Sequence, residues 1–87
     1  MSKIKEEETD MQYDSNAIEI GKRLAECRST LGKSLAEVAE TIGISPSALS
    51  MYESGERIPR DNIKIRLSQY YNVPIQTLFF AKTNHET

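Results

Sequence analysis

The stretch SLAEVAETIGISPSALSMYESG, residues 34–55, decides the fold of this chain of 87 residues. It opens with Ser34 and, three residues later, Glu37, the spacing of a capping box, in which each side chain accepts a hydrogen bond from the other residue's backbone N–H at a helix start. Gly43 then supplies the positive φ that ends a helix sharply. The apolar residues between these signals fall on one helical face: Leu35, Val38, Ala39 and Ile42.

A second short helix follows directly after this turn. Ser45 is a good N-cap and Pro46 suits the first helical position, where no N–H is needed. Leu49 and Tyr52 are three residues apart and are predicted to face inward, and Gly55 ends the helix. The opposite face carries Ser47, Ser50, Met51 and Ser54. Helices of about two turns are unstable alone, so both must pack on flanking helices.

A longer helix is predicted before this stretch, from Ala17 to Leu31, with Asp14, Ser15 or Asn16 as its cap. Its apolar residues form one stripe: Ile20, Leu24, Cys27 and Leu31. Because Cys27 lies on that stripe, the prediction is a small buried hydrophobe rather than a redox sensor.

Two helices are predicted after the stretch. The first runs from Asp61 to Asn72, with Ile65 at the edge of the core, and Asn72 suits a left-handed helix end. Its apolar face comprises Ile63, Leu67, Tyr70 and Tyr71. The second runs from Val73 to Phe80. Phe79 and Phe80 cannot both point inward easily, so one is expected to be exposed as a candidate dimer contact.

Residues 20–79 resemble the phage repressor/Cro-type helix-turn-helix family, also known as the xenobiotic-response-element type. The resemblance covers 60 of the 87 residues. The matching residues are Ile20-Gly21-Lys22-Arg23-Leu24, Arg28, Gly32, Glu37, Ala39, Gly43-Ile44-Ser45, Ser50, Glu53, Gly55, Pro59 and Leu78-Phe79. It implies an all-α fold: a compact five-helix bundle that contains a helix-turn-helix, the lambda-repressor-like domain that binds operator DNA. We therefore expect an acidic, disordered N-terminal arm over residues 1–16, the DNA-binding domain over 17–80 and a tail over 81–87.

The overall charge of −2 hides an asymmetry that bears on DNA binding. Residues 1–19 carry two lysines and six acids, whereas residues 20–87 carry nine basic and seven acidic residues. The folded part is therefore mildly basic, and a local basic patch matters more for phosphate binding than the total. The acidic arm is either a solvated tail or a functional segment that competes with DNA or docks a protein partner.

Several functional classes are disfavoured by the sequence. No apolar run approaches the roughly 18 residues needed to cross a membrane, and no signal-peptide core is present. The single cysteine excludes an internal disulfide, and one histidine with one cysteine makes a structural zinc site unlikely in chemical terms. There is no Ser/His/Asp set, metal cluster or phosphate-cradling glycine loop. We expect no cofactor, no enzymatic activity and a cytoplasmic, DNA-associated protein of bacterial or phage origin.

The resemblance assigns candidate DNA contacts residue by residue. The base-facing positions are Ser45, Pro46, Ser47, Ser50 and Met51. Lys33, Arg57 and Arg60 are the candidates for phosphate contacts, the two arginines because they flank Pro59 just after the predicted reading helix. The matching family arginine and glutamate form an ion pair, which implies a structural pair between Arg28 and Glu53.

The chain departs from the family pattern in ways that affect DNA reading. Leu35 stands where many members have a phosphate-gripping glutamine, and the reading face lacks Gln, Arg, Asn and Lys. None of its side chains makes the bidentate pairing that reads guanine or adenine, whereas Pro46 and Met51 can pack on thymine methyls. We expect modest direct readout, an A·T preference, some dependence on DNA shape and a homodimer on an inverted repeat.

Two functions remain open from the sequence. The first is a sequence-specific transcriptional regulator, a repressor of double-stranded DNA targets. The second is an antitoxin-like or anti-repressor module that keeps the fold and binds a protein partner. The acidic arm and the short side chains of the reading face favour the second.

Overall fold

A computed structural model of the chain describes residues 15–81, which form five helices and, within that range, no strand. The helices are α1 (Ser15–Leu31), α2 (Leu35–Ile42), α3 (Pro46–Ser54), α4 (Asp61–Tyr71) and the π-helical turn η2 (Gln76–Phe80). The all-α, five-helix prediction is confirmed. No helix in this range is long and apolar enough to cross a membrane.

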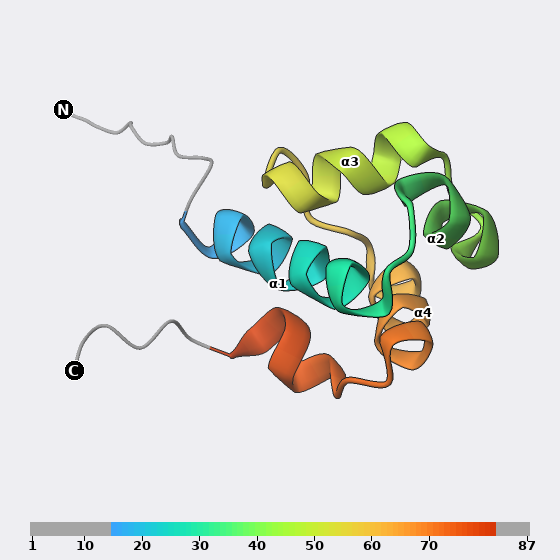
Figure 1. Cartoon of the computed structure of the whole chain (residues 1–87). Helices are drawn as coiled ribbons and strands as arrows, with labels where there is room; N and C mark the ends of the chain where they lie inside the picture. The colour runs from blue at the N-terminus through green and yellow to red at the C-terminus, as the bar shows by residue number, and fades with distance from the viewer. Residues whose placement is uncertain (1–14, 82–87) are drawn as a thin grey trace, which may run out of the picture.

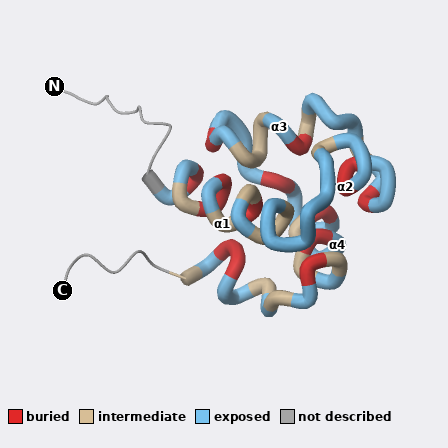
Figure 2. Tube along the Cα trace, viewed as in Figure 1, coloured by how far each residue is buried: buried red, intermediate tan, exposed pale blue. Residues whose placement is uncertain are grey.

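The longest helix, α1, lies in the middle of the domain, with α3 on one side and η2 on the other (Figure 1). The α2 and α4 helices complete the domain at the end of α1 that leads into α2. Buried side chains from every helix meet between them (Figure 2). The core comprises Ile20, Leu24, Val38, Ala39, Ile42, Leu49, Ile63, Leu67, Tyr71, Leu78 and Phe79.

The α2–turn–α3 unit is shaped by local hydrogen bonds, as its sequence predicts. The Ser34 N–H donates to Glu37 Oε1 at 2.9 Å and the Glu37 N–H donates to Ser34 Oγ at 3.1 Å, which closes the capping box. Gly43 has φ of 91° and donates its N–H to the Ala39 carbonyl at 2.8 Å. A side chain at this φ would be strained, so glycine suits the sharp turn between the helices.

The close approach of α1 and α3 depends on Gly21. A Cβ atom at this position would lie 2.7 Å from the Tyr52 carbonyl oxygen and would also clash with the Glu53 carbonyl. These are backbone atoms of α3, which cannot rotate away as a side chain can. The lack of a side chain at residue 21 therefore sets how near the two helices pack.

Two arginines fasten the remaining helices. Arg66 of α4 donates from Nη1 to the Ile42 carbonyl at 3.1 Å, at the end of α2. Arg23 of α1 donates from Nη1 to the Leu78 carbonyl and from Nη2 to the Ala81 carbonyl, both at 3.0 Å. Both arginines therefore satisfy carbonyl groups at helix ends, which have no partner within the helix.

The structure corrects several details of the predictions at the first and last helices. The first helix begins at Ser15 rather than Ala17, so of the three candidate caps only Asp14 precedes it, and Asp14 lies outside the described residues. Leu31, predicted on the buried stripe, is 48% exposed because it sits in the last turn of α1, beyond the reach of η2. Cys27 is only half-buried.

The apolar face of α4 is narrower than predicted. Tyr70 is half-buried, whereas Tyr71 is in the core. Ile65 is exposed rather than at the core edge. Phe79 is buried and Phe80 is 52% exposed, which confirms that only one of the two phenylalanines points inward.

Candidate nucleic-acid interface

The outward face of α3 presents most of the residues predicted to face DNA bases. Ser47 and Ser50 are exposed on this helix, as are Ser45 and Pro46 at its start, whereas Met51 is half-buried. The Ser45 hydroxyl accepts the Ala48 N–H at 3.0 Å and so caps the helix. Its O–H proton is still able to donate to an acceptor outside the helix. The start of α3 thus combines a helix N-terminus with a hydroxyl donor at the surface.

Arg57 and Arg60 come together in the loop between α3 and α4. Both are exposed and both line one polar hollow of about 340 Å³. Arg60 is also the N-cap residue of α4, so the N–H groups of the first turn of that helix lie beside it. Guanidinium groups next to a helix N-terminus make a surface suited to an anionic oxygen.

Asn62, which no sequence argument singled out, lines the same hollow. Its amide can donate to a phosphate oxygen, as the two arginines can. The available signal is its position in the first turn of α4, two residues after Arg60. The other residues around the hollow are Tyr52, Ile58 and Ile63.

Lys33, the third candidate for phosphate contact, is separate from this hollow. It is exposed in the loop between α1 and α2, immediately before the capping residue Ser34. Its carbonyl accepts a hydrogen bond from Arg28 Nη1 at 3.0 Å, which holds the loop on α1. Lys33 therefore flanks the start of α2, whereas the two arginines flank the start of α4.

Arg28 and Glu53 form the ion pair that the resemblance implies. Arg28 Nε donates to Glu53 Oε2 at 2.8 Å and Nη2 donates to Oε1 at 2.9 Å. Their side chains are 23% and 11% exposed, so neither faces the solvent fully. The pair links α1 to the last turn of α3, and the bond to the Lys33 carbonyl extends the link to the start of α2.

Within residues 15–81, no group of three or more His, Cys, Asp or Glu side chains is arranged to hold a metal ion. The polar groups that do gather are the arginines, Asn62 and the serines of α3. They are hydrogen-bond donors at the surface, which suits the binding of an anionic polymer.

Two short helices joined at a sharp turn, held on a longer helix and followed by a pair of arginines, define a helix-turn-helix domain. The chain matches the family described as helix-turn-helix domain over residues 21–84. It belongs to this family and is a DNA-binding domain of the class that regulates transcription.

A solved structure has the same fold. It is the solution structure of the SOS-response transcriptional repressor LexA from Eubacterium rectale, with a TM-score of 0.75 and 24% sequence identity, covering 85% of this chain and 79% of that chain. No curated protein is a significant sequence match to this chain.

Proposed function

We propose that this protein is a transcriptional repressor that inserts α3 into the major groove of its operator DNA. The observation that carries the proposal is the exposed hollow shared by Arg57 and Arg60, directly after α3. An α-helix fits the width of the major groove, and guanidinium groups beside it would fix its position on the phosphate backbone. The neighbouring fold in a protein titled a transcriptional repressor supports the regulatory part of the proposal.

Base reading by this face would be modest. Ser45, Ser47 and Ser50 carry short hydroxyl side chains that accept several bases. Pro46 and the exposed part of Met51 are suited to thymine methyl groups. An A·T preference, reinforced by the shape of the DNA, follows from these side chains.

Binding as a two-fold homodimer on an inverted repeat would double these contacts. Phe80 supports this part of the proposal because it is 52% exposed at the end of η2. The Lys64 ammonium lies 4.9 Å from the centre of the Phe80 ring and 5.8 Å from that of Phe79. An aromatic ring with a cation on one side is a contact surface that a second copy can cover.

The phosphate contacts can be tested with Arg57→Ala and Arg60→Ala. Each variant should weaken binding to all DNA sequences, and the logarithm of affinity against the logarithm of salt should lose about one unit of slope per contact. Lys22→Ala is the matched control because Lys22 is an exposed cation of α1 outside the hollow. Equal affinities and slopes for all three variants would refute the assignment of the hollow.

Base reading can be tested by selecting bound DNA from a random pool, with the solution mass measured alongside. Met51→Ala should change the preferred sequences, whereas Arg57→Ala should leave the preference and lower the affinity. Recovery of an inverted repeat together with a dimeric mass would support the two-fold arrangement. Selection of the same sequences by the Met51→Ala variant would contradict the proposed role of that side chain.

The second candidate is a protein-interaction module on the same fold, of antitoxin or anti-repressor type. The absence of long polar side chains at positions 46–51 of α3 favours it. A protein partner through the acidic arm concerns residues outside the described range. Co-purification with a defined partner, without any salt-sensitive DNA binding, would favour this function over the first.

A further inference from the structure

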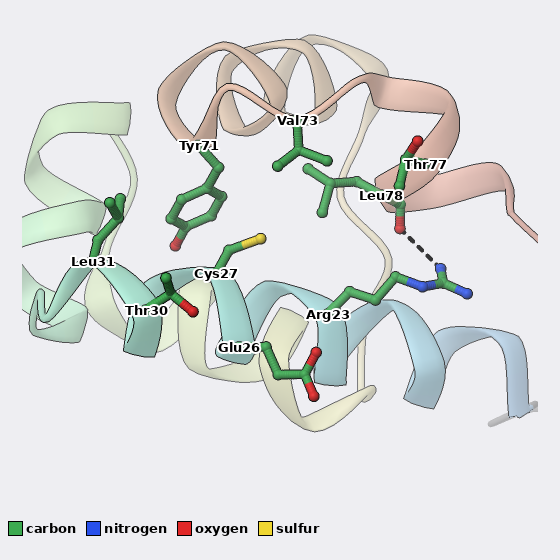
Figure 3. Close-up of a pocket in the computed structure, with 9 residues that line it drawn as sticks. All are labelled: Arg23, Glu26, Cys27, Thr30, Leu31, Tyr71, Val73, Thr77 and Leu78. Atoms are coloured by element: carbon green, nitrogen blue, oxygen red, sulfur yellow. Dashed lines mark hydrogen bonds between the residues drawn. The ribbon is translucent and has the colours of Figure 1, made fainter.

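A cavity of about 330 Å³ lies between α1 and the segment that runs from the end of α4 into η2 (Figure 3). This is the side of α1 that faces η2, whereas α3 packs on the other side. The cavity is lined by Arg23, Glu26, Cys27, Thr30, Leu31, Tyr71, Val73, Thr77 and Leu78. Its volume is at the lower end of the range of about 300–1,000 Å³ found for small-molecule sites.

Most of the wall is apolar. Cys27, Val73 and Leu78 supply its inner surface, and Leu31 is 48% exposed at its edge. Partial burial, followed by the charge of Glu26, raises the pKa of the Cys27 thiol, so this group remains a neutral side chain. Figure 3 shows the Arg23 guanidinium turned toward the Leu78 carbonyl, to which it donates at 3.0 Å. The cavity therefore offers little to a charged molecule.

One polar atom in this wall has no partner. Tyr71 is 8% exposed, and its hydroxyl oxygen is buried without a hydrogen bond to any described residue. Its ring points from α4 toward α1, with the hydroxyl between Leu31 and Cys27 (Figure 3). A buried group left without a partner is costly, so such a group calls for a bound molecule. Burial raises the pKa of this phenol above its usual range, so the hydroxyl keeps its proton and acts as a donor.

We propose that this cavity binds a small, uncharged, mainly apolar molecule whose carbonyl oxygen accepts a hydrogen bond from the Tyr71 hydroxyl. The apolar wall receives the body of the ligand, and the hydroxyl fixes its orientation. The exposed side chains of Thr30 and Leu31 stand beside the hydroxyl, and a change of their rotamers opens the path to it. This inference is independent of DNA binding, since none of the candidate DNA contacts lines the cavity.

The test uses acetophenone, which combines an aromatic body with one carbonyl, titrated into the full 87-residue chain and followed by amide NMR shifts. Saturable shifts should occur at the residues lining the cavity. Tyr71→Phe keeps the ring and removes the donor, and should weaken binding about three- to tenfold, the loss of one ordinary hydrogen bond. Tyr70→Phe is the matched control, because its half-buried ring lies outside the cavity wall, and should bind as the parent does.

Cys27→Leu provides a second test because the larger side chain fills the cavity. A folded Cys27→Leu protein should show no saturable shifts at the lining residues. The proposal is overturned if Tyr71→Phe binds acetophenone as tightly as the parent, which would assign the hydroxyl to a bound water. It is also overturned if the parent chain gives no saturable shifts in the cavity, or if filling the cavity leaves binding unchanged.

Discussion

Arg28 of α1 holds Glu53 of α3 through two hydrogen bonds, Nε to Oε2 at 2.8 Å and Nη2 to Oε1 at 2.9 Å. The two residues are 25 positions apart, and the pair lies where α1 meets the end of the proposed reading helix. Its fork-to-fork geometry restricts both side chains, because the guanidinium plane and the carboxylate must align. Two atoms at fixed distances thereby set the position of α3 on α1.

Breaking this pair from one side should destabilise the fold. Glu53→Ala leaves a partly buried guanidinium unpaired, and we expect a loss of about 2 kcal/mol, below the 3–5 kcal/mol typical of fully buried pairs because Arg28 is 23% exposed. Urea denaturation measures this loss. The double variant Arg28→Met/Glu53→Met should recover much of the stability, since it leaves no lone charge. A single variant as stable as the parent would show that the pair contributes nothing measurable.

The capping box of α2 should make stability depend on acidic pH. The hydrogen bond from the Ser34 backbone N–H lowers the pKa of Glu37 below its ordinary value of 4.5. The stabilisation is therefore fully present above pH 4.5 and is lost as the pH falls through the lower folded-state value. Melting temperatures of the parent and of Glu37→Gln should converge as the pH is lowered below 4.5. Curves that stay parallel throughout would contradict this linkage.

Gly21→Ala gives a test in which two physical effects have opposite signs. Helix propensity alone predicts a gain of about 1 kcal/mol when alanine replaces a glycine inside a helix. The clash with the carbonyl oxygens of Tyr52 and Glu53 predicts a loss instead, of about 1–3 kcal/mol. We expect the loss to prevail in urea denaturation. Ala36→Ser, which adds one atom at an exposed site of α2, should change stability by less than about 0.5 kcal/mol. A stabilised Gly21→Ala protein would show that α1 and α3 can separate easily.

Removing residues 1–14 should strengthen DNA binding. This segment carries two lysines and five acids, and its charge repels phosphates over about a Debye length. It joins α1 near α3, since Ile18 lies 3.0 Å from the position of a Cβ atom on Gly55. Affinity for one DNA duplex, measured at low and high salt, should rise several-fold on removal at low salt and little at high salt. Replacing the five acids by their amides is the matched control and should act alike. A weaker complex would mean that the segment contributes contacts of its own.

The local signals in the sequence were sufficient to predict most of the fold. The capping box at Ser34, the glycine at residue 43 and the helical spacing of the apolar residues act within a few positions, so their outcome can be derived without knowing the tertiary structure. Leu31 was the failure of this approach. Periodicity assigned it to the buried face, but burial also needs a neighbour, and the last turn of α1 extends past η2.

The fastening arginines were not predictable in the same way. Arg23 bonds to carbonyl groups 55 and 58 residues away, and Arg66 bonds to one 24 residues away. Carbonyl groups are present at every residue, so no side-chain pattern marks which one an arginine reaches. The same reason hid Asn62, whose proximity to Arg57 and Arg60 depends on how the loop folds onto α4. The identity of the bases read by α3 stays a prediction, because short hydroxyl side chains suit several of them.

The two bonds from Arg23 also have a use in protein engineering. They hold Ala81 against α1, so an added segment leaves the domain on the side of α1 opposite to α3 (Figure 1). Two copies can then be joined in tandem without covering the outward face of α3. Neighbouring half-sites on DNA lie about 34 Å apart, and a flexible Gly/Ser chain of roughly 40 residues has that average span. A single polypeptide of this design would recognise an inverted repeat at concentrations where separate copies do not meet.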